Sequence, residues 1–192
     1  MIDAALQIIG EEGYRAMTTT RIEEVAGVSR GLVGYHFGSM RGLTEAVVRH
    51  VGDLFVRDVI APQAAHQGAG IAGVLALIRG YLGQLGRDPR PSRAMLILIV
   101  ESFASQPDLR DVVRGLNEGL RDSLRDQLLR GQKDGSVRPD VDPKAESVVL
   151  VGVLRGIAVQ WLADPGGVDL GRATDGAVDV AARAYAVHRP TA

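Results

Sequence analysis

Apolar residues recur at intervals of three and four along most of the chain, a spacing that places them on one face of an α-helix. The longest such stripe covers residues 109–128, within an otherwise charged segment. Another covers residues 71–85 and ends before two prolines, Pro89 and Pro91. Alternation with a period of two, the pattern of a half-buried strand, is nearly absent. The sequence therefore predicts an all-α fold of about nine helices.

Capping residues mark where several of these helices begin and end. Gly13 follows the first apolar stripe, at the position of a helix C-cap. Asp142 and Pro143 form an N-cap acid followed by a proline at the first helical position. The longer helices are expected at residues 41–63, 71–85, 109–128, 143–163 and 170–188.

The first 50 residues differ from the rest in the length of their segments. Turn signals follow one another closely there, whereas the later helices are long. This contrast predicts a small N-terminal domain over residues 1–45 and a larger helical domain over residues 46–192, with a helix over residues 41–63 joining them.

The composition restricts the chemistry that the chain can perform. The chain has 192 residues, no cysteine and a formal net charge of −1. The absence of cysteine excludes disulfides, thiol catalysis and cysteine-ligated metal sites, and we expect no metal or cofactor. The near-neutral charge gives no overall attraction to nucleic acid, so any such binding must come from local features.

Residues 148–163 form the most apolar segment, although Arg155 and Gln160 interrupt it. A bilayer span needs roughly 20 consecutive apolar residues. The start of the chain has neither the basic flank nor the cleavage site of a signal peptide. We therefore expect no membrane association, a cytoplasmic location, and a buried helix over residues 148–163.

Two short helical segments flank a glycine turn near the N-terminus. In the first, Thr20 and Glu23 fit the spacing of a capping box. Gly27 can adopt a positive φ, and Ser29 is placed to cap a second helix over residues 30–37. Two short helices joined by such a turn form a helix-turn-helix, whose second helix enters the major groove of DNA.

The residues around this turn resemble the N-terminal region of the tetracycline-repressor (TetR) family of transcriptional regulators. The family pattern contains Ala-Ala, Gly-Tyr, Thr-Thr, Ile-Ala, Ala-Gly-Val-Ser, Tyr-Tyr-His-Phe and Lys-x-x-Leu in this order. The chain matches it at Ala4-Ala5, Gly13-Tyr14, Thr18-Thr19, Ile22, Ala26-Gly27-Val28-Ser29, Tyr35-His36-Phe37 and Leu43. The resemblance covers about residues 1–50.

The resemblance implies a homodimeric repressor that binds a pseudo-palindromic operator in double-stranded DNA and is released by a small-molecule effector. Phosphate contacts are expected at Thr19, Ser29, Tyr35 and His36. Arg30 is expected to contact a base edge, preferably that of guanine. Arg21 is expected to contact either a phosphate or a base edge. The full set expected at the DNA is Thr19, Thr20, Arg21, Ser29, Arg30, Gly31, Gly34, Tyr35, His36 and Arg41.

Three positions depart from the family pattern. Gly34 replaces a tyrosine, Met40 replaces a lysine, and Glu23 replaces an alanine, which places a negative charge near the expected DNA-facing surface. Between residues 15 and 41, four arginines still outnumber two glutamates. The glycines Gly31 and Gly34 have two open explanations, close approach to DNA or tolerated flexibility. The alternative function is a small-molecule-binding helical protein whose N-terminal domain has lost DNA binding.

In the family, the last two long helices pair with those of a second subunit. The resemblance places this interface at residues 146–163 and 170–188, where Gly152 and Gly156 would let helices approach closely; packing within one chain is the alternative. An effector is expected within the helical domain, and the low aromatic content of 4% favours an aliphatic or small polar one. The candidate pocket residues are Met95, Glu101, Phe103, Arg155, Gln160 and Trp161.

Residues 68–73 match the GxGxxG pattern of dinucleotide-binding loops, but that motif requires a preceding strand. A predicted helix and a polar link precede it here. The sequence contains no nucleophile elbow, HExxH motif or paired carboxylates with catalytic spacing. We therefore expect no enzymatic activity.

Overall fold

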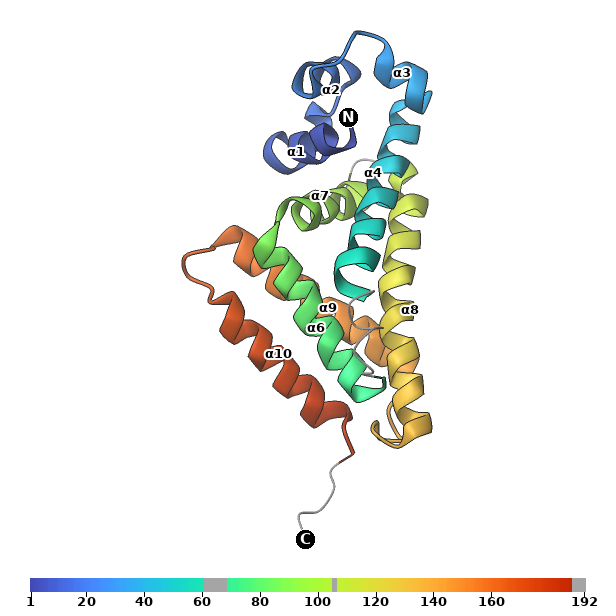
Figure 1. The fold of residues 1–192 in the computed structure, drawn as a ribbon, viewed down its shortest axis with the longest axis vertical. Coiled ribbons are helices and arrows are strands. Elements are labelled where there is room, and N and C mark those ends of the chain that lie inside the picture. The colour runs from blue at the N-terminus through green and yellow to red at the C-terminus, as the bar shows by residue number, and fades with distance from the viewer. Residues whose placement is uncertain (61–68, 105–106, 188–192) are drawn as a thin grey trace. The chain divides into compact units, whose positions relative to one another are not determined.

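The computed structural model describes residues 1–60, 69–104 and 107–187. These residues form nine α-helices, three short 3-10 or π-helical segments and no named strand, which confirms the all-α prediction (Figure 1). Two compact units divide the chain. Unit 1 comprises Met1–Leu54 and Asp88–Asn117, and unit 2 comprises Phe55–Arg87 and Glu118–Ala192. The domain boundary between residues 45 and 46 stays a prediction.

Unit 1 holds the helix-turn-helix together with a helix from much later in the chain. Its elements are α1 (Ile2–Glu12), η1 (Tyr14–Ala16), α2 (Thr19–Ala26), α3 (Leu32–Phe37), most of α4 (Met40–Phe55), α7 (Arg90–Ala104), η3 (Pro107–Leu109) and the start of α8 (Arg110–Asp134). α1 packs against α7. Side chains from these elements form one hydrophobic core that includes Ile8, Ile9, Ile22, Val33, Leu43, Val47, Ala94, Met95, Leu98 and Val113. The helix-turn-helix is therefore supported by α7 as well as by its own helices.

Unit 2 consists of η2 (Val56–Ile60), α6 (Ile71–Arg87), the rest of α8, α9 (Pro143–Ala163) and α10 (Leu170–Tyr185). α6 packs against both α9 and α10, and α10 lies alongside α6 in Figure 1. Tyr185 donates a hydrogen bond of 2.8 Å to Glu146, which ties the end of α10 to the start of α9.

The capping signals predicted for α1 and α9 agree with the observed helix ends. Gly13 follows α1 with a φ of 89°. The Asp142 carboxylate accepts hydrogen bonds from the Lys144 and Ala145 amides at 2.9 and 3.3 Å, and Pro143 begins α9 as predicted.

Some expected ends differ or cannot be compared. The joining helix α4 gives way to the π-helical η2, and the expected residues 61–63 lie outside the described residues. α10 ends at Tyr185, and His188 is also outside them. Of the GxGxxG pattern, Gly68 is not described, and Gly70 has a φ of 67° in the turn directly before α6.

The prediction that residues 148–163 form a buried helix is wrong. The side chains of Val148, Val149 and Val159 are 53, 52 and 51% exposed in the single chain, and Val153 is 39% exposed. The buried residues of α9 lie on the face that packs against α6 and α10, and the opposite face stays open. Among the described helices, α9 is the one whose length and composition would also allow it to cross a membrane.

Candidate functional site

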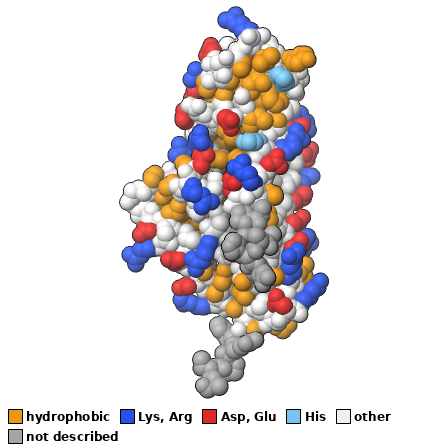
Figure 2. All heavy atoms as spheres, viewed as in Figure 1, with side chains coloured by type: hydrophobic (Ala, Val, Ile, Leu, Met, Phe, Trp, Pro, Cys, Tyr) orange, Lys and Arg blue, Asp and Glu red, His pale blue; other side chains and the backbone are white. Residues whose placement is uncertain are grey.

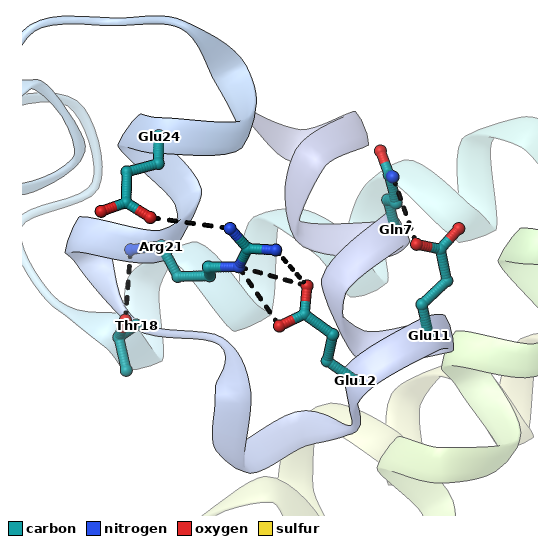
Figure 3. A network of polar contacts seen from close by, with 6 residues as sticks. All are labelled: Gln7, Glu11, Glu12, Thr18, Arg21 and Glu24. Atoms are coloured by element: carbon teal, nitrogen blue, oxygen red, sulfur yellow. Dashed lines mark hydrogen bonds and ion pairs between the residues drawn. The ribbon is translucent and has the colours of Figure 1, made fainter.

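Thr18 rather than Thr20 caps the first helix of the helix-turn-helix. α2 begins at Thr19, and the Thr18 side chain accepts a hydrogen bond of 3.2 Å from the Arg21 amide (Figure 3). Thr20 therefore lies inside the first turn, where it cannot be an N-cap. The predicted capping box of Thr20 and Glu23 is wrong.

The turn after α2 depends on the positive φ predicted for Gly27. This residue has a φ of 64° and lies in the left-handed region. Its amide donates to the Glu24 carbonyl at 3.2 Å, and the Val28 amide donates to the Glu23 carbonyl at 3.0 Å. Glycine reaches this conformation without the steric cost that a side chain would add.

The second helix begins two residues later than predicted, and Ser29 does not cap it with its side chain. α3 starts at Leu32 after Gly31, which has a φ of 85° and no side chain to offer. The Ser29 carbonyl accepts from the Leu32 amide at 3.3 Å. The positive φ explains the glycine at position 31, whereas a Cβ at Gly34 would meet nothing within 4 Å.

Glu23 is buried, contrary to the expectation that it adds negative charge to the surface. Its side chain is 7% exposed, and its carboxylate accepts a hydrogen bond of 3.3 Å from the Val33 amide near the start of α3. The acid therefore points into unit 1 toward the second helix. One of the three sequence arguments for a lost DNA-binding function is removed.

All ten residues expected at the DNA are exposed and lie between α2 and the start of α4. Tyr35 is the most prominent, with 84% of its side chain exposed. Its ring makes an edge-to-face contact with that of His36, with centroids 5.3 Å apart. Figure 2 shows hydrophobic side chains around a histidine at this end of unit 1. Exposed hydroxyl, imidazole and guanidinium groups thus lie on and beside the two short helices.

Carboxylates pair with two of the expected DNA-binding arginines, Arg21 and Arg41. The Arg21 guanidinium donates to both oxygens of Glu12, with the shortest contact at 2.7 Å, and lies 3.6 Å from Glu24 (Figure 3). The hydrogen bonds with Arg21 lower the pKa of Glu12, and the same contacts raise the pKa of Arg21. Arg41 is paired in the same way with Glu45, at 2.9 Å. For Arg30, the described residues contain no carboxylate at ion-pairing distance.

The six candidate effector residues are divided between the two units. Met95 is 7% exposed and belongs to the hydrophobic core of unit 1. Glu101 is half-buried and Phe103 is 66% exposed, both on α7. Arg155, Gln160 and Trp161 lie on α9 in unit 2.

Within unit 2, the candidate effector residue Arg155 contacts a neighbouring helix. It hydrogen-bonds Tyr81 of α6, whose ring makes an edge-to-face contact with Phe55 at a centroid distance of 6.1 Å. Burial raises the pKa of Tyr81 and lowers the pKa of Arg155, and their hydrogen bond opposes both shifts. Gln160 is exposed and donates to the Gly156 carbonyl at 3.3 Å.

A separate open groove of about 510 Å³ lies in unit 1 between α4 and the start of α8. Val48, Gly52, Gly115 and Leu116 form part of its lining, together with charged residues of both signs. None of the six candidate effector residues lines it. No group of three His, Asp or Glu side chains among the described residues is placed to hold a metal ion.

Two family models match the sequence. The model of the bacterial regulatory proteins of the tetR family matches residues 1–47, and the model of the C-terminal region of BetI-type transcriptional repressors matches residues 71–190. The second match alone covers more than half of the chain. The chain belongs to the TetR family of bacterial regulatory proteins, and its C-terminal region is of the BetI type.

Individual relatives agree with this placement. The regulator BetI of Burkholderia thailandensis is 37% identical over 82 residues, which are 43% of this chain and 40% of the relative. The match thus spans about two fifths of that protein. A regulator from Saccharomonospora viridis in complex with choline has a TM-score of 0.80 at 21% identity, covering 97% of this chain and 96% of the other. FadR of Bacillus subtilis in complex with stearoyl-CoA has a TM-score of 0.81 at 18% identity, and the match covers 94% of this chain and 95% of FadR. At these identities the structures show that the fold is shared.

Proposed function

We propose that the protein is a ligand-responsive transcriptional repressor that binds operator DNA as a homodimer. The observation that carries this proposal is the exposed surface around α3. A glycine turn with a positive φ joins two short helices there, and every residue expected at the DNA is exposed. In this function α3 enters the major groove, with Thr19, Ser29, Tyr35 and His36 at phosphates.

The exposed apolar face of α9 supports the homodimer. Val149, Val153 and Val159 lie on this face with Gly152 and Gly156. A Cβ at either glycine would meet nothing within 4 Å, so packing within one chain does not explain them. We propose that α9, with α10, packs against the same helices of a second copy. A two-fold dimer presents two α3 helices to a pseudo-palindromic site.

The alternative to a second copy of the chain is that membrane lipid covers the apolar face of α9. However, α9 carries the charged residues Lys144, Glu146 and Arg155, which are costly in the interior of a bilayer. The proposed location is therefore the cytoplasm, with no membrane association.

The proposed mechanism is a shift between two conformations of the dimer. The chain passes between the units at residues 54–55, 87–88 and 117–118. An effector bound among the helices of unit 2 would act through these connections and move the two DNA-binding surfaces out of register. Only an effector with different affinities for the two conformations has this effect. The different ligands of the two structural neighbours leave its chemical class open.

The test is binding of the full-length protein to a duplex from its own promoter region, compared with an unrelated duplex of equal length. We expect the promoter duplex to bind at least about a thousandfold more tightly, which is the lower end of the usual range. Equal affinity for both duplexes, or no binding by dimeric protein at low salt, would contradict the proposal.

Met40→Lys is expected to strengthen operator binding and to steepen its salt dependence by about one ion. Met40 is the first residue of α4 and packs partly against the core of unit 1. A lysine stem can keep this packing while its ammonium group reaches outward to a phosphate. Titration of binding against salt concentration measures the change, and an unchanged slope would show that position 40 does not face DNA.

Glu12→Gln is expected to strengthen binding severalfold at low salt, because it releases Arg21 from its closest carboxylate. Glu11→Gln is the matched control: Glu11 is also exposed near the end of α1, but it accepts from Gln7 rather than from an arginine (Figure 3). An equal gain in both variants would reveal only a general charge effect and would refute a DNA contact by Arg21.

A further inference from the structure

We infer that Glu23 is a positioning residue for DNA recognition, because its buried carboxylate holds the start of α3 in place. This inference rests on the DNA-binding function proposed above. Glu23 itself is 7% exposed and points away from the expected DNA-facing surface. It acts on DNA through the orientation of α3.

Glu23 binds both sides of the turn between the two helices. On the side of α2, its backbone carbonyl accepts the Val28 amide at 3.0 Å. On the side of α3, its carboxylate accepts the Val33 amide at 3.3 Å. A single residue thus accepts hydrogen bonds from backbone amides of the turn and of the first turn of α3.

The start of α3 needs such an acceptor from elsewhere in the chain. The first amides of any helix lack partners within the helix. The N-cap residue here is Gly31, whose positive φ serves the turn but which has no side chain. The Leu32 amide bonds to the Ser29 carbonyl, and the Val33 amide bonds to Glu23. A carboxylate at this end also interacts favourably with the helix dipole.

The position of Val33 determines which way the exposed residues of α3 point. The Val33 side chain is 1% exposed and packs in the core of unit 1. Gly34, Tyr35 and His36 follow it directly and are exposed. α3 has only six residues, of which Val33 is the buried one and Phe37 packs partly against the same core. An unpaired Val33 amide in this buried place would favour a rotation of the helix toward other acceptors.

Three substitutions in the full-length protein separate hydrogen bonding from charge. Glu23→Gln keeps an oxygen acceptor at the same distance but removes the charge. Glu23→Asp keeps the charge but is one methylene shorter, and Glu23→Ala removes both. For each variant we would measure affinity for the promoter duplex and for an unrelated duplex, the unfolding midpoint, and hydrogen exchange of the amides in α3.

We expect Glu23→Ala and Glu23→Asp to lower the preference for the promoter duplex about tenfold, and Glu23→Gln to stay within about twofold of the unchanged protein. A folding defect alone would not alter this preference in the protein that remains folded. The inference is overturned if Glu23→Ala keeps the full preference, or if Glu23→Asp retains it while Glu23→Gln loses it.

Hydrogen exchange distinguishes failure of this inference from failure of the proposed function. If the unchanged protein does not prefer its promoter duplex, the proposed function is refuted. The exchange rate of the Val33 amide still shows whether the Glu23 side chain holds it. Faster exchange in Glu23→Ala and Glu23→Asp than in Glu23→Gln supports the positioning role. Equal exchange in all three variants refutes it.

Discussion

Val153→Asp is expected to separate the dimer into single chains and to lower operator affinity by at least about a hundredfold. Val153 lies on the open apolar face of α9, between Gly152 and Gly156 in the sequence. In a dimer formed by this face, the new carboxylate would be buried without a partner, which costs about 3–5 kcal/mol. A single chain presents only one α3 to the operator, so the loss of the dimer is also a loss of DNA binding.

Val100→Asp is the control for this substitution. Val100 is 51% exposed on α7, so the same change in charge occurs at an exposed valine on a different helix. Sedimentation and operator binding would be measured for both variants. We expect Val100→Asp to remain dimeric. A Val153→Asp protein that is still dimeric and binds the operator normally would show that α9 does not form the interface.

Arg30→Ala is expected to lower operator affinity by about 1–3 kcal/mol and to relax the preference at one base pair of each half-site. Arg30 is exposed and lies two residues before α3, and it is not engaged by a carboxylate among the described residues. Its guanidinium group can donate two hydrogen bonds to a guanine, which is the commonest specific contact of arginine.

A panel of operator variants, each changed at one base pair, measures this preference. Arg41→Ala serves as the comparison. Arg41 follows Met40, which replaces the family's lysine, so we expect its guanidinium at a phosphate; in the free protein it is paired with Glu45. We expect Arg41→Ala to weaken binding to all sequences evenly. If Arg30→Ala does the same, Arg30 contacts a phosphate and our assignment to a base is wrong.

Several features that depend on neighbours in the sequence could be predicted, although the caps expected at Thr20 and Ser29 are not observed. Gly27 follows α2 with the positive φ that its place in the turn required. Asp142 and Pro143 begin α9, and Gly13 ends α1, because these residues act on backbone groups within one helical turn. The residues expected at the DNA are all exposed for a related reason, since they lie in or beside two short helices whose apolar residues face the core.

Features that depend on contacts between distant residues could not be predicted. Glu23 fits a capping box by spacing, but the position of α3 provides the amide that it actually binds, ten residues away. Arg21 carries positive charge in the sequence, yet Glu12 on another helix neutralises it. Met95 was expected in an effector pocket because of its chemistry, whereas the packing of α7 against α1 places it in the core of unit 1.

The exposure of one face of α9 could not be predicted from the sequence either, for a different reason. The valines and glycines of α9 are typical of a buried helix. The sequence does not show whether the surface that buries them belongs to the same chain or to a second copy. In a single chain that face is open, as the exposure of Val149 and Val159 shows. A second copy of α9 provides the missing cover in the proposed dimer.

A nuclease footprint of the full-length protein on its own promoter tests the central claim most directly. A two-fold dimer with two α3 helices should protect one region that contains two inverted half-sites, with centres about 10 base pairs, or a multiple of that distance, apart. Changing either half-site should abolish protection. Protection of a single half-site without inverted symmetry, or no protection by dimeric protein, would contradict the account.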